Sequence, residues 1–315
     1  MRHNRSLAAA VFAVLVVASL PVRAVDGVIE INQKIALAGG VTASDAPGFP
    51  VTIDTSGSYR LTGNLSVDQK TTAIQVTAAA ADVEIDLNGF SILGPTTCTA
   101  PPTVTCSPLG GGRGIDRLGA PESYLRVSHG AVRGMGDRAM FAVGALVVDG
   151  VEATHNGVDG IDGGDNSLIS HVLATRNGKL GILVGGSAAV RDSTASLNGM
   201  GGIVVGSASL VERNQATSNV GAGISTARGC TVNGNASSFN TSGLVSGVGF
   251  FVDLGSSVFD NTARGNAVWG LWFGAAGGYG RNVLSGNNGG DANAQVFGPG
   301  LQLGTNVCGA DTICP

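Results

Sequence analysis

Three aspartates lie within seven residues of one another near the middle of the chain: Asp159, Asp162 and Asp165. Two carboxyl groups at such a spacing can act as the acid and the base of glycoside cleavage, and three can supply oxygen ligands to a calcium ion. Because Asp and Asn beside glycine are also typical of sharp, solvent-exposed corners, turn formation is the favoured interpretation. If the protein is an enzyme, Asp159 and Asp162 are the candidate catalytic residues and Asp165 is a candidate ligand-binding residue.

An acidic cluster could also support lyase chemistry if it faced an arginine or lysine base. Arg133, Arg138 and Arg176 lie close enough in the repeat described below to be considered, but no motif selects one of them. No motif calls for an organic cofactor. We therefore expect none, with calcium as the one candidate ion.

Aromatic residues that could contact a sugar gather in the last third of the chain, where Trp269 and Trp272 lie close together. In an alternating strand, Leu271 and Phe273 would point inward, which sends Trp272 outward. An exposed tryptophan can stack on a sugar ring, and packing at the end of the fold is an equally favoured role. Trp272 is therefore a candidate ligand-binding residue.

Asparagines recur at 21-residue steps through the second half of the chain, with apolar residues at fixed offsets. In the first four units, the fifth residue after each asparagine is isoleucine and the thirteenth is isoleucine or valine. After five extra residues the pattern resumes with two further asparagines in the same role. The seven are Asn156, Asn177, Asn198, Asn219, Asn240, Asn266 and Asn287.

Alternating apolar positions, such as Ile182 and Val184, predict three short strands per unit, separated by glycine or asparagine corners. Stacking such units in parallel register places equivalent residues in columns about 4.8 Å apart. Because Asn tolerates a left-handed backbone and its amide can bond to the next coil, we expect a buried asparagine ladder at one corner. Charged residues at the same step, such as His171, Asp192 and Arg213, are expected to form outward ion-pair ladders.

The first 24 residues contain a basic start, an apolar stretch from Leu7 to Leu20 and a small-residue end, which is typical of a secretory signal peptide cleaved after Ala24. The apolar stretch is shorter than a bilayer span, and no later segment has an apolar run of that length. We therefore expect a secreted or periplasmic product without a membrane span.

Composition narrows the class of the mature protein. Cleavage would remove three arginines and no acid, which takes the net charge from −4 to −7. An acidic chain without a basic cluster is not expected to bind nucleic acid. Glycine contributes 51 of 315 residues without the collagen period, and 43% of residues are hydrophobic, which excludes a disordered chain and indicates a turn-rich β protein.

The five cysteines would lie in an oxidising compartment after export. Cys98 and Cys106 bracket one short loop, and Cys308 and Cys314 bracket another, so two short-loop disulfides are the predicted pairing. Cys230 falls at an inward small-residue position of the repeat, and we expect it to be buried and unreactive.

The signal peptide, the segments SYRLTGNLSV, TAIQV and VEIDLNGFSI, a cysteine loop and 21-residue coils ending in GYGRNVLSGN together resemble the right-handed parallel β-helix repeat proteins exported by many bacteria. The wider superfamily includes pectate lyases, polygalacturonases, adhesins and tailspikes. The stretch around Asp159 is similar to the first aspartate motif of polygalacturonases, but the adjacent aspartates on the next coil, the Gly-His-Gly and the Arg-Ile-Lys are missing. Leu180 and Leu183 stand one repeat after Asp159 and Asp162, so polygalacturonase activity is not expected.

These patterns predict an all-β protein: a single-stranded right-handed parallel β-helix of about a dozen coils with a 21-residue repeat. The expected organisation is a signal peptide over 1–24 and one domain over 25–315, with irregular coils at 25–130, regular coils at 131–290 and a disulfide-closed cap at 291–315. The favoured function is that of a non-catalytic surface or carbohydrate-interacting protein, because no acid/base set is complete. The alternative is a polysaccharide lyase or glycoside hydrolase with its site around Asp159 to Asp165. Under both, a polysaccharide is the expected partner.

Overall fold

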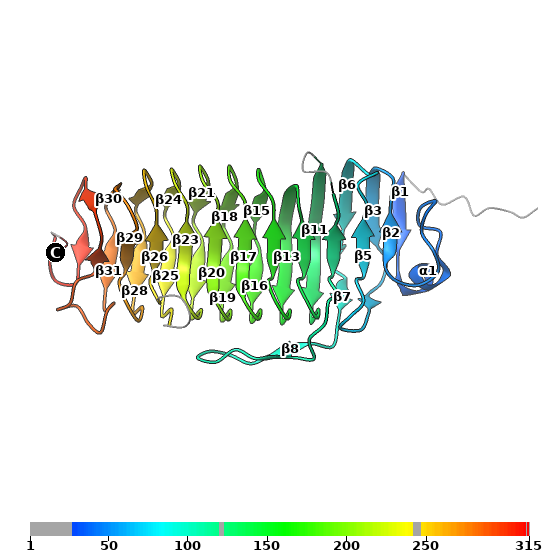
Figure 1. Cartoon of the computed structure of the whole chain (residues 1–315), viewed down its shortest axis with the longest axis horizontal. Helices are drawn as coiled ribbons and strands as arrows, with labels where there is room; N and C mark the ends of the chain where they lie inside the picture. Colours follow the sequence, from blue (N-terminus) through cyan, green and yellow to red (C-terminus); the bar gives the residue numbers. More distant parts are fainter. Residues whose placement is uncertain (1–26, 120–122, 242–246, 313, 315) are drawn as a thin grey trace, which may run out of the picture.

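The computed structural model describes residues 27–119, 123–241, 247–312 and 314, which wind into a right-handed parallel β-helix of about 12 turns (Figure 1). The coils stack along one axis, with the N-terminal coils at one end of the rod and the C-terminal coils at the other. The predicted fold class and the 21-residue repeat are confirmed. The predicted signal peptide, residues 1–24, lies outside the described residues.

Two parallel sheets form the walls of the rod. The smaller has 11 strands, one per coil: β2 (Val51–Ile53), β5 (Ile74–Val76), β10 (Ile115–Arg117), β12 (Met140–Ala142), β14 (Ile161–Gly163), β17 (Leu180–Val184), β20 (Gly201–Val205), β23 (Ala222–Thr226), β26 (Phe250–Val252), β29 (Leu271–Phe273) and β32 (Val296–Phe297).

The larger sheet has 21 strands and bends around a corner, so most coils contribute two strands to it. They are β1 (Val28–Ile31), β3 (Gly57–Leu61), β4 (Leu65–Ser66), β6 (Asp82–Asp86), β7 (Ser91–Leu93), β11 (Tyr124–Arg133), β13 (Ala145–Thr154), β15 (Leu168–Ser170), β16 (Leu173–Thr175), β18 (Ala189–Arg191), β19 (Thr194–Ser196), β21 (Leu210–Glu212), β22 (Gln215–Thr217), β24 (Thr231–Asn233), β25 (Ala236–Ser238), β27 (Ser257–Phe259), β28 (Thr262–Arg264), β30 (Gly277–Gly280), β31 (Val283–Ser285), β33 (Gly300–Gln302) and β34 (Val307–Cys308).

Strand register shows why the repeat is 21 residues long. Ile161 pairs with Ile182, Ile182 with Ile203 and Ile203 with Ile224, so one buried isoleucine column runs through four coils. The next step pairs Ile224 with Phe250 in the same sheet. The longer coil therefore keeps the strand register, and the core column continues without a break.

The predicted asparagine ladder is present, and its members are buried. From Asn177 onward, each side-chain oxygen accepts from both the backbone N–H and Nδ2 of the asparagine one coil earlier; Asn198 Oδ1 accepts from Asn177 N and Nδ2 at 3.0 and 3.1 Å. Asn198 Nδ2 also donates to the Ala174 carbonyl at 3.1 Å. At the C-terminal end, Gln295 Oε1 takes the place of the next asparagine by accepting from Asn287. Buried amides are thus fully paired.

Left-handed backbone occurs one residue before each of these asparagines, which corrects the expectation that the asparagines themselves adopt it. His155, Arg176 and Leu197 have φ values of 58°, 52° and 58°. A residue of varied type therefore makes the corner. Asparagine is required for its hydrogen bonds to the next coil and not for its backbone conformation.

A second asparagine ladder, which the sequence analysis did not identify, follows another corner of the rod. Asn214 Nδ2 donates to Asn235 Oδ1 at 3.1 Å, and the same pattern continues through Asn261, Asn282 and Asn306. Its steps are 21, 26, 21 and 24 residues, so no fixed period marks it in the sequence.

Ion pairs link exposed corners of neighbouring coils, in part as predicted. Arg213 Nε lies 2.8 Å from Asp192 Oδ1, one coil earlier. His171 does not pair with Asp192; its Nδ1 lies 2.7 Å from Asp149 Oδ1, on the preceding coil.

A short helix, α1 (Gln33–Ala38), lies at the N-terminal end of the rod (Figure 1). Asn32 Oδ1 accepts from the Ile35 N–H at 3.0 Å and so caps the helix, while Ala36 is buried against the core. Among the described residues, no helix has the length and the apolar character needed to cross a membrane.

Both predicted disulfides are formed, Cys98–Cys106 and Cys308–Cys314. The first joins β8 (Thr97–Cys98) to β9 (Cys106–Ser107) in a hairpin that lies along the side of the coils (Figure 1). A Cβ on Gly178 would lie 3.0 Å from Cys106 Sγ, and one on Gly199 would lie 3.2 Å from Val104 Cβ. These glycines, 21 residues apart, leave room for the hairpin to pack against the coils.

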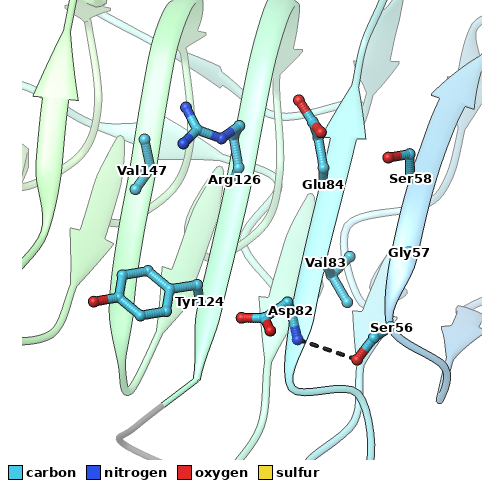
Figure 2. Close-up of a pocket in the computed structure, with 9 residues that line it drawn as sticks. All are labelled: Ser56, Gly57, Ser58, Asp82, Val83, Glu84, Tyr124, Arg126 and Val147. Carbon is cyan, nitrogen blue, oxygen red and sulfur yellow. Dashed lines mark hydrogen bonds between the residues drawn. The ribbon is translucent and has the colours of Figure 1, made fainter.

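The outer face of the larger sheet is hollowed over β3, β6, β11 and β13, where a cavity of about 500 Å³ opens (Figure 2). Val83 on β6 pairs with Gly57 on one side and Leu125 on the other. These steps are 26 and 42 residues, so the 21-residue period does not extend across β3, β6 and β11.

Candidate functional site

The outer face of the smaller sheet brings together charged residues from successive coils. β10, β12 and β14 pair in register, so Asp116, Phe141 and Asp162 form one row across the coils. Ile115 and Ile161, which precede two members of the row, are fully buried. Because side chains alternate along a strand, the row lies on the outer face.

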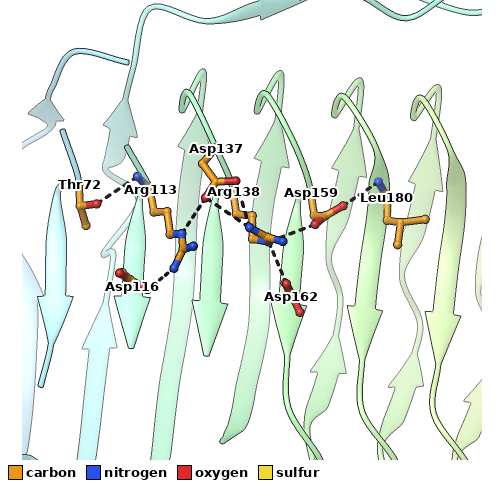
Figure 3. A network of polar contacts seen from close by, with 8 residues as sticks. All are labelled: Thr72, Arg113, Asp116, Asp137, Arg138, Asp159, Asp162 and Leu180. Carbon is orange, nitrogen blue, oxygen red and sulfur yellow. Dashed lines mark hydrogen bonds and ion pairs between the residues drawn. The ribbon is translucent and has the colours of Figure 1, made fainter. Parts of the chain in front are cut away.

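Two arginines and four aspartates form an ion-pair network around this row (Figure 3). Arg113 lies on the N-terminal side, with Nη1 2.8 Å from Asp116 Oδ1 and Nε 2.8 Å from Asp137 Oδ2. Its guanidinium also lies over the Phe141 ring, 4.4 Å from the centroid. This half of the network connects the coil of β10 to the coil of β12.

Arg138 extends the network to the coil of β14. Its Nη1 lies 3.1 Å from Asp137 Oδ1, and its Nε lies 3.1 Å from Asp159 Oδ2 and 2.8 Å from Asp162 Oδ2. That Nε–H makes no well-aligned hydrogen bond to either carboxylate, although it lies between them. Four carboxyl groups thus share two guanidinium groups.

Burial raises the pKa of both Asp159 and Asp162 above the ordinary aspartate value, and nearby Arg138 opposes this shift. Asp159 is only 3% exposed, and its Oδ1 accepts from the Leu180 N–H of the next coil at 3.0 Å. Asp162 keeps 15% of its side chain exposed. The more accessible carboxyl group of the pair is therefore Asp162, with Arg138 as its cation.

The structure brings Asp159 and Asp162 to one arginine, but Asp159 does not occupy the exposed corner expected for it. Its carboxylate is withdrawn from solvent because it binds the next coil's backbone and Arg138 together. Asp165 is exposed and accepts from the Gly186 N–H at 2.6 Å, outside the network. Of the three arginines considered from the sequence, Arg138 contacts this cluster.

The other two arginines lie elsewhere. Arg133 pairs with Glu152 on the larger sheet, and Arg176 makes the corner before Asn177. Sequence reasoning missed Arg113, Asp116 and Asp137, which lie in or next to the irregular coils. The Arg138–Asp159 ion pair could have been predicted from the sequence, because these residues are 21 positions apart, the same step that predicts the outward ion-pair ladders.

An aromatic cluster lies farther along the same face. Phe251, Trp272 and Phe297 pair in register on β26, β29 and β32. Trp269 stacks on Phe297 with ring centroids 4.2 Å apart, and Trp272 meets Phe251 edge-on at 5.2 Å. Phe297 is 46% exposed, and Trp269 and Trp272 are partly exposed. Trp272 therefore points outward, as its alternation with Leu271 indicates.

The row between the charged network and the aromatic cluster carries short uncharged side chains. Asp162 is followed, coil by coil, by Leu183, Val204 and Ser225. The next member of the row is Phe251. The outer face of the smaller sheet thus has charged residues at one end, aromatic residues at the other, and uncharged, non-aromatic side chains in the row between them.

Within the described parts of the chain, no group of three or more His, Cys, Asp or Glu side chains is arranged to hold a metal ion. The aspartates around Arg138 and Arg113 are engaged by guanidinium groups. The free cysteine, Cys230, is 1% exposed, and burial raises the pKa of its thiol.

The sequence matches the family described as the right handed beta helix region over residues 112–294. The chain belongs to this β-helix family. No curated protein matches the β-helix chain. Among solved structures, a double mutant of the periplasmic alginate epimerase AlgG is 14% identical, with 81% of this chain and 76% of that chain covered and a TM-score of 0.51.

Two further solved structures align with this chain at lower TM-scores. The Azotobacter vinelandii mannuronan C-5 epimerase AlgE6 A-module is 16% identical over 82% of this chain and 81% of that one, with a TM-score of 0.37. The Dettilon tailspike protein is 16% identical over 79% and 61%, with a TM-score of 0.41. At these identities the comparisons show the fold alone.

Proposed function

We propose that this protein is an exported, non-catalytic β-helix protein that binds a polysaccharide along the outer face of its smaller sheet. The observation that carries the proposal is the partly exposed cluster of Trp269, Trp272, Phe251 and Phe297. Aromatic rings with a polar edge and an apolar face are suited to stacking on sugar rings. An alginate epimerase of the same fold acts on a polysaccharide, which agrees with this class of partner.

The uncharged row between the charged network and the aromatic cluster extends the proposed binding surface. Leu183, Val204 and Ser225 lie in the same row as Trp272, at the strand spacing of about 4.8 Å. A polymer that stacks on the aromatic end can therefore continue over several coils without meeting a long side chain in this row. The proposal also includes export, which rests on the signal peptide predicted for residues 1–24.

The experiment follows tryptophan emission during titration with a panel of neutral and acidic polysaccharides. The chain has two tryptophans, and both belong to the cluster, so emission reports directly on the proposed surface. Trp272→Ala should weaken binding about fivefold, because one stacked aromatic pair contributes on the order of 1 kcal/mol. Because this variant has lost one of the two tryptophans, its affinity is measured by calorimetry and not by fluorescence.

The matched control is Phe259→Ala, which removes an aromatic ring from the larger sheet. Its affinity should equal that of the wild type. Equal binding by the wild type and a Trp269→Ala, Trp272→Ala double variant would overturn the proposal, as would the absence of binding to every polysaccharide in the panel.

Polysaccharide cleavage at Asp162 is the second candidate function. It is favoured by two carboxyl groups on either side of one guanidinium, both with a pKa that burial raises above the ordinary aspartate value, so that they keep a proton to higher pH than an exposed aspartate does. Product analysis after incubation with the same panel tests it. Asp162→Asn should abolish product formation, whereas Asp159 is an unsuitable first target because it is buried against the next coil. A wild-type protein that releases no product rules out this candidate.

A further inference from the structure

A second surface of the rod carries polar and charged side chains on its outer face. The cavity over β3, β6, β11 and β13 is lined by Asp82 and Glu84 from β6 and by Tyr124 and Arg126 from β11 (Figure 2). It lies on the larger sheet, whereas the aromatic cluster and the charged network lie on the smaller one. The two surfaces are therefore separate.

Two of the charged groups of this cavity lack a side-chain partner within the described parts of the chain. Glu84 and Arg126 lie opposite each other on paired strands, yet their side chains make no ion pair or hydrogen bond among the described residues. Figure 2 shows Arg126 extending toward Val147 and away from Glu84. Both side chains are exposed and line the cavity, so their polar atoms are available to a ligand.

A buried arginine holds the two strands that carry these groups. Arg117 is fully buried, and its guanidinium donates to the carbonyls of Ala80 and Ala81, just before β6, and of Tyr124, at the start of β11. Its Nε also donates to Ser123 Oγ at 2.8 Å. Because these bonds fix the starts of β6 and β11 relative to each other, Asp82 and Tyr124 are held in place before any ligand arrives.

The charges of the cavity select the chemistry of its ligand. Two carboxylates would repel an anionic sugar, and Arg126 balances one of them, which leaves a single net negative charge in the lining. A hydroxyl group can donate to a carboxylate and also accept from a guanidinium, so neighbouring hydroxyls on one sugar satisfy both signs at once. Tyr124 is 53% exposed and offers a flat ring for the apolar face of the same sugar.

We propose that this cavity is a second saccharide site, which takes a neutral sugar unit through its hydroxyls. Glu84 and Arg126 bind neighbouring hydroxyl groups, Tyr124 stacks on the ring, and Ser58, next to Glu84 on β3, adds a further hydroxyl at the edge. A smaller hollow of about 230 Å³ shares Ser58 and Glu84 and continues along the strands. The site therefore has room for a neighbouring unit of an oligosaccharide.

The test uses the full chain with the aromatic surface disabled. Calorimetric titration of the Trp269→Ala, Trp272→Ala variant with neutral glucose tetramers of different linkage should detect the second site alone. Adding Arg126→Ala to this background should weaken binding at least tenfold, because hydrogen bonds to charged groups contribute about 1.5–3 kcal/mol. Glu84→Gln keeps the shape of the side chain and should weaken binding several-fold.

The matched control is Arg191→Ala, which removes an arginine from β18 of the same sheet, outside the cavity. Its affinity for the tetramers should not change. The proposal is overturned if the tryptophan double variant binds no neutral tetramer, if Arg126→Ala leaves its binding intact, or if galacturonate or glucosamine tetramers bind more tightly than neutral ones. None of these results depends on whether the aromatic surface binds polysaccharide, so the two proposals fail independently.

Discussion

The side-chain oxygen of Asn219 accepts two hydrogen bonds from Asn198, one from its backbone N–H at 3.1 Å and one from its Nδ2 at 2.9 Å. One oxygen atom thus pairs with both a backbone donor and a side-chain donor of the preceding coil. Because Asn198 does the same for Asn177, the loss of one member leaves unpaired groups on its neighbour.

Asn198→Ala should lower the free energy of unfolding by about 3 kcal/mol, because the buried N–H and amide of Asn177 lose their acceptor. Urea unfolding followed by circular dichroism measures the change. Gln215→Ala, at an exposed position of β22, is the control and should fall within about 0.5 kcal/mol of the wild type. An unchanged midpoint for Asn198→Ala would show that the ladder does not stabilise the rod.

The raised pKa values of Asp159 and Asp162 predict a specific pH dependence. Between the ordinary aspartate value of 3.8 and the raised native values, the folded state binds more protons than the unfolded state. Stability contributed by these groups should therefore rise as the pH falls from 7 toward 4. Unfolding free energies of the wild type and an Asp159→Asn, Asp162→Asn variant, compared across this range, should diverge in favour of the wild type.

Asp192 is the control, because its pKa is shifted in the opposite direction. Hydrogen bonds from Arg213 lower its pKa, so its contribution to stability is present above about 3.8 and is lost as the pH falls through the lowered value. The advantage of the wild type over Asp192→Asn should therefore shrink on acidification. Parallel pH profiles for the two comparisons would contradict the assignment of Asp159 and Asp162 as buried carboxyl groups.

Cys230 should resist thiol reagents in the folded protein, because its thiol is 1% exposed and burial raises its pKa. Mass spectrometry should find no label under native conditions and one label after unfolding without reductant, since the other four cysteines are joined in two disulfides. The variant Ser207→Cys, at an exposed corner, provides a thiol that should react at once. Rapid native labelling of Cys230 would mean that its coil is in a different register.

Arg117→Met should destabilise the protein by about 3 kcal/mol or more, because the carbonyls of Ala80, Ala81 and Tyr124 lose a charged donor inside the fold. Thermal and urea unfolding test this. Arg126→Ala, on the exposed face of the same strands, should leave stability nearly unchanged. If Arg117→Met is as stable as the wild type, the guanidinium is not needed to hold β6 and β11 together.

The regular half of the fold could be predicted because its chemistry repeats. Asn156 through Asn240 and the isoleucine column from Ile161 to Ile224 recur at one step, and stacking alone then places them. The second ladder escaped detection because its members are unevenly spaced, although their hydrogen bonds are equivalent. A structural role therefore shows in the sequence only when the coil length is constant.

The candidate sites could be predicted less well. Asp159, Asp162 and Trp272 were identified from residue type and strand alternation, but the partner that decides the state of the two carboxyl groups, Arg138, follows from how one coil sits on another. The cavity at Glu84 was not foreseen, because it lies in coils whose lengths differ. Arg117 was overlooked for a related reason: an arginine inside a β-helix contradicts residue preference, and only its carbonyl partners explain it.

The register of the rod survives a coil that is five residues longer than its neighbours. Asn240 still bonds to Asn266, and Ile224 still pairs with Phe250, across a 26-residue step. Ladder and strands therefore tolerate a connection that is five residues longer than the regular one. The corner that precedes Phe250 and Phe251 can thus change in length beside the aromatic cluster while the register of the scaffold stays the same.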